Sequence, residues 1–250
     1  MLERLDYVKL APRRVLDAGS GPMRDARVLA KRYRRADVLA VDFSLAMLHA
    51  GRPRLRFFQR RPPKPVCADM ARLPLASAAV GLIWSNMALH WAADPLAALR
   101  EFHRVLAVDG LLMFSTLGPD TLAELRSVAG GARVHSFPDM HDIGDMLVEA
   151  GFAEPVMDVE RLTMVYADGE ALLADLRASG QTSALAARAG EPRRGLAGRR
   201  FRAELSDKLA AQRRDGKLSV TYEVVYGHAW KAAPRQAADG RAIVQFERRR

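Results

Sequence analysis

Two glycines and an aspartate near the start of the chain are the first residues whose types and spacing could do chemistry. Asp17, Gly19 and Gly21 stand where an apolar strand pattern gives way to a helix pattern. Glycine lacks a Cβ, so the backbone can turn sharply there and approach a ligand closely; a plain tight turn is the alternative. A dinucleotide fingerprint would need a glycine at position 24, where the chain has Arg24. Asp17 would repel a pyrophosphate and attract an amino group, which favours an amino-acid-like ligand end.

Two more carboxylates follow later strand patterns. Asp42 ends the apolar run 38–42 and lies 21 residues beyond Gly21, about where such folds hold two ribose hydroxyls. Capping of the next helix is the alternative role for Asp42. Asp69 stands at the end of another short run, where an exposed carboxylate could accept a hydrogen bond from an exocyclic amine. Its neighbour Met70 could cover the face of a purine.

A polar and aromatic group follows the apolar run 80–85. Asn86, His90 and Trp91 come directly after it, and ligands of open α/β sheets bind at the carboxyl ends of strands. We therefore expect these three side chains to position substrates at the mouth of the site. The alternatives are a structural His90 with its polar atoms satisfied and a Trp91 that belongs to the core.

The elements that must hold these residues alternate between strand and helix in the first half, which predicts a doubly wound, mostly parallel α/β sheet. Two late strands separated by helices predict an antiparallel pair that finishes the sheet, with a small helical cap inserted before the last strand. We expect one domain over 1–231, with the cap at about 168–216 and a flexible basic tail over 232–250. The expected strands are 14–18, 38–42, 80–85, 111–115, 156–166 and 217–230, and the expected helices are 25–33, one capped by Ser44, 95–106, 138–150, 170–179 and 199–214.

In this order, the segments from about 15 to 116 resemble the class I S-adenosylmethionine-dependent methyltransferases. The resemblance implies a Rossmann-like, seven-stranded sheet and S-adenosyl-L-methionine as cofactor. Met23 departs from the family, which often has a third glycine there, and could narrow the pocket for the methionyl end. The turn 108–110, Val-Asp-Gly, replaces the usual Pro-Gly-Gly. The implied cofactor contacts are Asp17, Gly19 and Gly21 at the methionyl end, Asp42 at the ribose, Asp69 with Met70 at the adenine, and Phe43, Met47 and Asn86 nearby.

The second half resembles a narrower family, the malonyl-acyl-carrier-protein O-methyltransferases of biotin synthesis. The matching segments are 115–125, 135–145, 149–152, 193–200 and 221–230. The family methylates the free carboxyl of a malonyl group carried on acyl carrier protein. A carboxylate is already an oxygen nucleophile at neutral pH, so positioning and exclusion of water can replace a general base. The sequence indeed offers no arrangement typical of a nucleophile with its base.

The positive net charge of the chain indicates what kind of partner it could bind. A formal net charge of +10 favours an acidic partner, although arginines on solvated faces are the simpler alternative. The resemblance implies an acidic carrier protein, so we expect the cap arginines to dock it: Arg188, Arg193, Arg194, Arg199 and Arg200. The chain shows no aromatic-basic pattern for nucleic acid.

Composition limits the remaining function classes. No run approaches the roughly 18 apolar residues of a membrane span, and the N-terminus lacks the pattern of a secretory signal. The single cysteine, Cys67, excludes an intramolecular disulfide or a multi-cysteine zinc site, and we expect it to be a small buried apolar residue. We therefore expect a cytoplasmic, monomeric enzyme without a metal.

Two other functions stay open. The arginine-hydroxylating assembly factor of mitochondrial complex I shares the cofactor half and a similar ending, so a hydroxylase is one alternative. Members of the malonyl family usually carry a further helix before the segment that matches Met1 to Leu5, and it lies over the cofactor. Either the true start lies upstream, or the protein lacks this lid and binds S-adenosylmethionine without catalysis.

Overall fold

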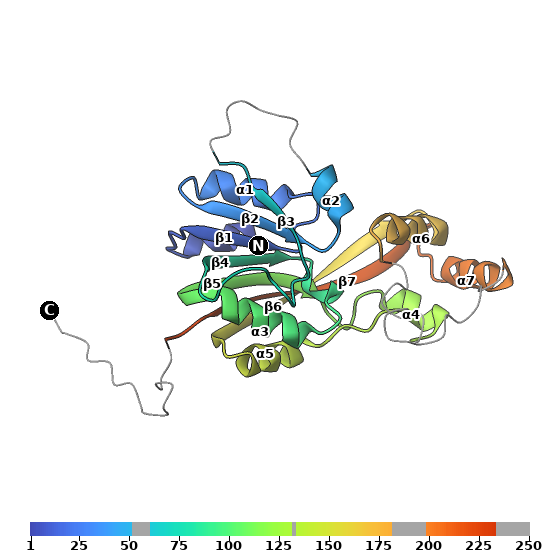
Figure 1. Cartoon of the computed structure of the whole chain (residues 1–250). Coiled ribbons are helices and arrows are strands. Elements are labelled where there is room, and N and C mark those ends of the chain that lie inside the picture. The colour runs from blue at the N-terminus through green and yellow to red at the C-terminus, as the bar shows by residue number, and fades with distance from the viewer. Residues whose placement is uncertain (52–60, 132–133, 182–198, 234–250) are drawn as a thin grey trace.

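The computed structural model describes residues 1–51, 61–131, 134–181 and 199–233, and a seven-stranded sheet forms its centre (Figure 1). The strand order is β3-β2-β1-β4-β5-β7-β6. The first five strands are parallel, and β7 runs antiparallel to both β5 and β6. The predicted doubly wound sheet with an antiparallel ending is confirmed. The strands are β1 (Arg14–Ala18), β2 (Asp37–Asp42), β3 (Lys64–Cys67), β4 (Val80–Asn86), β5 (Leu106–Leu117), β6 (Ala153–Tyr166) and β7 (Leu218–Trp230).

Each face of the sheet has its own hydrophobic core, because successive strand side chains point to opposite faces. In β1, Leu16 packs among residues of α3 (Pro95–Val105) and α5 (Met140–Glu149), whereas Val15 packs among residues of α1 (Arg24–Arg32) and the short helix η1 (Leu2–Tyr7). Both side chains are fully buried. This two-sided burial explains why the parallel strands read as continuous apolar runs.

The helix ends follow the expected capping chemistry in most places. The Ser44 hydroxyl accepts a hydrogen bond from the Met47 N–H and caps α2 (Leu45–Ala50), as predicted. Asp94 caps α3 in the same way. The first helix is an exception, because Met23 precedes it in the left-handed conformation with φ 56° and makes no side-chain cap.

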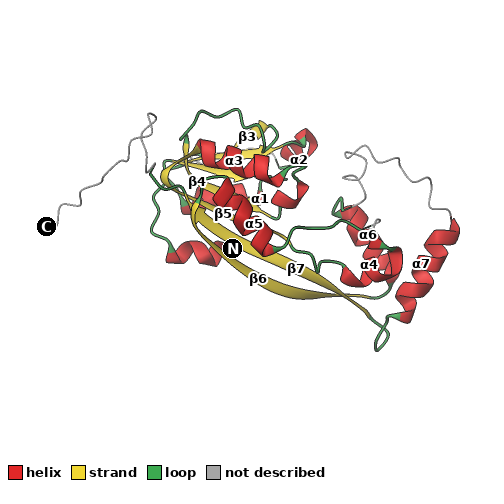
Figure 2. Ribbon diagram, turned by 90° about the horizontal axis from the view of Figure 1, so that it is seen from below, coloured by secondary structure: helices red, strands yellow, loops and turns green. Residues whose placement is uncertain are grey.

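The helical cap is larger than the sequence predicts. Helices α6 (Gly169–Ala178) and α7 (Arg199–Ala211) lie between β6 and β7 in the chain, as expected, but α4 (Ala123–Ala129) joins them at the far end of the β6–β7 ribbon (Figure 2). Seven residues without a capping side chain carry little local signal. The three helices share a separate core that includes Leu122, Leu125, Leu172, Leu176, Leu205, Leu209, Leu218 and Val220.

Two strands begin earlier in the chain than the sequence predicts. β5 begins at Leu106, before the turn 108–110, and β6 begins at Ala153, so both strands are longer than predicted. Residues 234–250 of the predicted tail lie outside the described residues, and the domain boundary at 231 stays a prediction. None of the helices in the described part of the chain is long and apolar enough to cross a membrane.

Candidate active site

The glycine turn after β1 lies at the carboxyl edge of the sheet, and its two glycines have different physical roles. Gly19 and Gly21 have φ values of +75° and +48°. A Cβ on Gly19 would lie 2.2 Å from the Cβ of Ala88, whereas a Cβ on Gly21 would meet nothing within 4 Å. Gly19 is therefore required by packing inside the protein. Gly21 instead borders open space that a ligand could occupy.

Met23 does not point into that space. Its side chain is 2% exposed and belongs to the core formed with α1 and η1. The left-handed backbone that a third glycine would adopt easily is adopted here by a methionine anchored in the core. The departure at this position therefore leaves the turn open to the ligand side.

Asp17 supplies a buried carboxylate beneath the turn. It is 2% exposed, and its Oδ2 has no hydrogen-bond partner within the part of the chain that the structure describes. Burial raises the pKa of Asp17 well above its usual value, and the nearby charges of Asp25 and Asp42 raise it further, against a lowering hydrogen bond from the Ala26 backbone. An unpartnered, buried carboxylate favours a cation, and an amino group of a ligand would satisfy it. The site therefore fits the amino end of S-adenosyl-L-methionine.

Asp42 lies at the end of β2 and faces the same turn. Its Oδ2 accepts a hydrogen bond from the Gly21 N–H at 2.8 Å, and its Oδ1 accepts one from the Ser44 N–H at 2.8 Å. A carboxylate has about four acceptor positions, so two remain for a pair of ribose hydroxyls. Ser44 and not Asp42 is the N-cap of α2, but Asp42 contacts the start of that helix through the Ser44 N–H. The ribose role of Asp42 stays a prediction.

The residues expected at the adenine include exposed and buried side chains. Phe43 and Met47 are 57% and 50% exposed, which leaves apolar surface beside the tip of β2. Asp69 is exposed, and its Oδ1 accepts a hydrogen bond from the Ala71 N–H at 2.9 Å. Met70 is only 8% exposed and packs in the core below Gly19. The apolar surface open to a purine here comes from Phe43 and Met47 more than from Met70.

The prediction that Cys67 is buried is wrong. Its thiol is exposed and donates a long hydrogen bond of 3.5 Å to the Phe43 carbonyl. Cys67 ends β3, a short edge strand whose residues are mostly exposed. A strand that has a neighbour on one side only cannot bury a side chain as a central strand does.

Asn86, at the end of β4, is held by a residue that the sequence analysis missed. Asp25, in the first turn of α1, accepts hydrogen bonds on Oδ2 from Trp84 Nε1 and from Asn86 Nδ2, both at 2.9 Å. The Ser115 hydroxyl donates to Asn86 Oδ1 at 2.6 Å. The orientation of the Asn86 amide is therefore fixed from both sides. An acidic residue one turn beyond the glycines was the only sequence signal for this role.

His90 and Trp91 form an aromatic group at the mouth with Phe137. The His90 ring centroid lies 5.3 Å from that of Trp91 and 5.8 Å from that of Phe137. Burial, with a smaller contribution from His135, lowers the pKa of His90 to about 4. His90 is therefore neutral at pH 7 and supplies no cation. Its buried Nδ1 has no hydrogen-bond partner among the described residues.

The cap reaches this aromatic group. A Cβ on Gly180, just after α6, would lie 3.8 Å from the ring of Trp91. Trp91 is half-buried, so its side chain is neither part of the core nor fully exposed to solvent. The structure thus brings together the glycine turn, Asp42, Asn86, the aromatic group and one end of the cap at a single edge of the sheet.

The predicted docking arginines are only partly covered by the structure. Arg188, Arg193 and Arg194 lie outside the described residues. Arg199 and Arg200 begin α7, but their side chains also lie outside the description. The docking role of all five stays a prediction.

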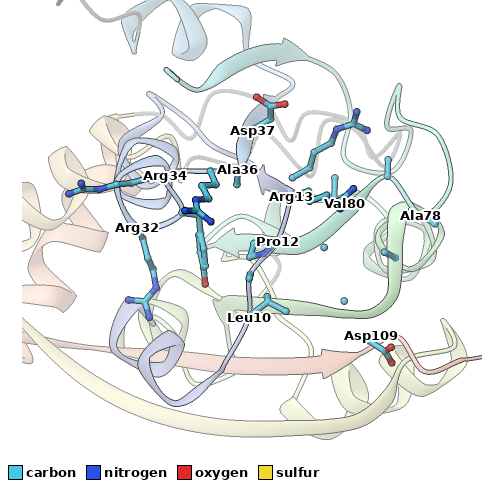
Figure 3. A pocket seen from close by; sticks show the side chains of 18 of the residues that line it. Leu10, Pro12, Arg13, Arg32, Arg34, Ala36, Asp37, Ala78, Val80 and Asp109 are labelled. Atoms are coloured by element: carbon cyan, nitrogen blue, oxygen red, sulfur yellow. The ribbon is translucent and has the colours of Figure 1, made fainter. Parts of the chain in front are cut away.

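Part of the positive charge lies elsewhere, around a hollow of about 1250 Å³ at the amino ends of the strands (Figure 3). Six arginines and two aspartates are among the residues that line it. Arg14 begins β1 and Asp37 begins β2, where they are register partners, so this edge is opposite to the glycine turn. The surplus charge of the chain is therefore not confined to the cap. The lining arginines are Arg13, Arg14, Arg32, Arg34, Arg35 and Arg61.

No group of three or more His, Cys, Asp or Glu side chains in the described ranges is arranged to hold a metal ion. The side chains that the structure places at the carboxyl edge are carboxylates, the Asn86 amide and an aromatic wall.

Comparisons with known proteins place the chain in one family. Residues 16–114 match the family model described as "Methyltransferase domain". The malonyl-[acyl-carrier protein] O-methyltransferase of Gallionella capsiferriformans is 50% identical over 98% of this chain and 86% of that protein. The enzyme of the same name from Laribacter hongkongensis is 49% identical over 98% of this chain and 86% of its own length.

Solved structures share the fold at lower sequence identity. A putative methyltransferase from Bacillus halodurans has a TM-score of 0.64 at 19% identity, over 93% of this chain and 97% of that one. Phosphoethanolamine N-methyltransferase 2 of Haemonchus contortus, solved with S-adenosyl-L-methionine, has a TM-score of 0.58 at 17% identity, over 93% of this chain and 51% of that one. These neighbours confirm the class I methyltransferase fold, and the identity to the curated relatives shows that the chain belongs to the malonyl-[acyl-carrier protein] O-methyltransferase family.

Proposed function

We propose that this protein transfers the methyl group of S-adenosyl-L-methionine to the free carboxyl of a malonyl group on acyl carrier protein, an early step of biotin synthesis. The observation that carries the proposal is the buried Oδ2 of Asp17, which has no hydrogen-bond partner among the described residues and lies near the end of β1, just before the glycines. Such a carboxylate needs a cation, and the family supplies one in the amino end of its cofactor. Family membership supports the choice of acceptor.

The proposed cofactor contacts follow the carboxyl edge of the sheet. Asp17 takes the amino group, while Gly19 and Gly21 let the backbone approach the methionyl end. Asp42 takes the ribose hydroxyls with its two remaining acceptor positions. The adenine lies toward the next strand, where we assign Phe43, Met47, Asp69 and Met70. When bound, the cofactor supplies a methyl group on a positively charged sulfur.

The residues of this chain act on the acceptor by positioning. The malonyl carboxylate is ionised at neutral pH, so no group has to remove a proton from it. His90 is neutral because of its lowered pKa, and with Trp91 and Phe137 it forms an aromatic wall that excludes water. Asn86, held by Asp25 and Ser115, presents its amide at the same mouth. Orientation and exclusion of water are large effects for a reaction between two bound groups.

The partner and the setting are parts of the same proposal. The acidic carrier protein docks on the cap, through Arg188, Arg193, Arg194, Arg199 and Arg200, so that its arm reaches the mouth beside Trp91. The enzyme acts as a monomer in the cytoplasm and takes no nucleic acid. Size-exclusion chromatography with and without the carrier tests the monomer and the complex together.

The two alternatives make different predictions about the methyl group. The curated relatives are named for methyl transfer, which does not favour an arginine hydroxylase. A hydroxylase would leave the cofactor's methyl group where it was. A binding protein without catalysis would bind the cofactor and also leave the label in place.

The test is incubation with methyl-labelled S-adenosylmethionine and malonyl-acyl carrier protein. We expect label on the carrier that mild base releases, as from a methyl ester. Acetyl-acyl carrier protein, which has no free carboxyl, is the control and should stay unlabelled. Cofactor binding measured by calorimetry without any label on the malonyl carrier would overturn the proposal.

A further inference from the structure

Asp25 joins two parts of the site that are far apart in sequence. It stands in the first turn of α1, and its Oδ2 accepts the N–H groups of Trp84 and Asn86 from β4, both at 2.9 Å. A carboxylate oxygen has two lone pairs, so both acceptor positions of this oxygen are occupied. The helix that follows the glycine turn is thereby tied to the strand that ends at the mouth.

The same contacts define what Asn86 can offer to a ligand. Its Oδ1 accepts from the Ser115 hydroxyl and one N–H goes to Asp25. The amide has two N–H donors, so one donor remains, and Asn86 is exposed at the end of β4. Asp25 and Ser115 together decide the direction in which that donor points.

We infer that Asp25 is a positioning residue for the methyl transfer: it fixes the Asn86 amide so that the remaining N–H of this amide is presented at the mouth where the acceptor binds. The inference rests on the proposed function. In the transfer an acceptor carboxylate oxygen bonds to the methyl group, the bond from the methyl group to sulfur breaks with its electron pair left on sulfur, and no proton has to move. The rate then depends on how the two bound groups are oriented, and Asp25 acts on that orientation through Asn86.

A simpler role for Asp25 makes different predictions. An acidic residue in the first turn stabilises any helix, and a hydrogen bond to Trp84 could serve folding alone. Asp25→Asn keeps an acceptor oxygen of nearly the same shape and removes the charge. Asp25→Ala removes both. Asp145→Asn, at an exposed position of α5 on the other face of the sheet, removes one charge away from the site and serves as the matched control.

The first experiment measures Kd for S-adenosylmethionine by calorimetry. We expect Asp25→Asn and the control Asp145→Asn to bind the cofactor within about threefold of the wild type, because both keep an acceptor for the Asn86 amide. Loss of cofactor binding in a folded Asp25→Asn protein, with binding kept in Asp145→Asn, would overturn a role that acts through the acceptor oxygen. Failure of the wild type to bind S-adenosylmethionine would instead count against the proposed function.

The second experiment separates positioning from folding. We expect Asp25→Ala to lower kcat by about tenfold or more, and Asp25→Asn to restore most of kcat, because Asn86 regains an acceptor. The emission of Trp84 should shift in Asp25→Ala and return toward the wild type in Asp25→Asn, against the background of Trp91 and Trp230. Equal loss of kcat in both variants, with their thermal stability intact, would overturn the positioning role.

Discussion

Asp42 accepts a hydrogen bond from the backbone N–H of Gly21 at 2.8 Å, which ties the end of β2 to the glycine turn after β1. The backbone N–H groups of Gly19 and Ser20 strengthen the tie, since both donate to the Val41 carbonyl. The proposed ribose and methionyl contacts therefore belong to one connected unit that exists before any ligand binds. Preorganisation of this kind reduces the entropy lost on binding.

Replacement of Asp42 tests this unit. Asp42→Ala should weaken binding of S-adenosylmethionine by ~1.5–3 kcal/mol, the scale expected for charge-assisted hydrogen bonds to hydroxyls. It should also lower the thermal stability, because the N–H groups of Gly21 and Ser44 lose their acceptor. Calorimetry and thermal denaturation measure the two effects. An unchanged dissociation constant would remove the ribose assignment.

Gly21→Ala tests whether the open space at the turn belongs to the cofactor. The new Cβ would have no atom of the described residues within 4 Å, so we expect its cost to folding to be strain at φ +48°, about 1 kcal/mol. We expect cofactor affinity to fall about tenfold or more, because the Cβ would occupy ligand space. Gly130→Ala is the matched control, since Gly130 also has positive φ and an open Cβ direction but lies at the end of α4. Equal affinity in the two variants would contradict a ligand at the turn.

The raised pKa of Asp17 predicts that cofactor binding depends on pH. A bound ammonium favours the ionised carboxylate, so binding should lower this pKa and release protons. Affinity should therefore rise with pH from the usual carboxyl range of about 4 up to the raised value in the free protein. Calorimetry in buffers of different ionisation enthalpy should detect the protons for the wild type and not for Asp17→Asn. A wild-type affinity that is flat with pH would contradict the amino-group assignment.

Asp17 should also affect folding. The folded state binds its proton more tightly than the unfolded state, so stability from this group is lost as pH rises above the unfolded pKa. Asp17→Asn should consequently be more stable than the wild type at neutral pH. Urea denaturation of both proteins over pH 4 to 8 measures the difference, and a less stable Asp17→Asn would show that its ionised form is well supported without ligand.

His90 predicts an acid sensitivity of the fold. Its pKa is about 4 in the folded protein, against about 6.5 when unfolded. The unfolded state therefore binds more protons in this window, and stability is lost as pH falls from about 6.5 toward 4. Between pH 7 and pH 5 the wild type should lose about 2 kcal/mol more than His90→Gln. Urea denaturation of both proteins at the two pH values measures this difference in stability. Equal losses of stability in the wild type and in His90→Gln would show that His90 is solvated.

The docking proposal is tested by two sets of arginine replacements, one in the cap segment and one around the hollow. Replacing Arg193, Arg194, Arg199 and Arg200 by Ser should raise KM for malonyl-acyl carrier protein at low salt, because opposite charges steer association. Turnover of malonyl-coenzyme A, which offers no acidic protein surface, should hardly change. The wild type should lose its preference for the carrier as salt rises toward about 0.5 M, where the screening length shortens to a few ångströms.

The matched control replaces four arginines of the hollow at the opposite edge: Arg13, Arg14, Arg34 and Arg35. It removes the same charge, so steering by net charge alone would raise KM equally in both variants. A specific docking face on the cap leaves KM of the control near that of the wild type. A rise confined to the control would move the docking face to the hollow.

The sequence by itself determined most of the elements and the residues of the glycine turn. Apolar runs and helix-periodic patterns show which residues of a strand or a helix are buried. Such a pattern can be recognised from neighbouring residues alone. The glycine turn and Asp42 were recognisable for the same reason, because a sharp turn and a strand end each have their own residue preferences. The order of the strands then brought these residues together.

Only the tertiary structure decided which side chains meet and which are buried. Asp25 and Trp84 are separated by 59 residues, and no local pattern reports a hydrogen bond over that distance. The burial of Met70, the exposure of Cys67 and the lowered pKa of His90 depend on neighbours supplied by other elements. The same holds for α4, whose seven residues are helical because they pack against α7 and β7. Desolvation and packing are properties of the assembled fold, so these features appear only when it is complete.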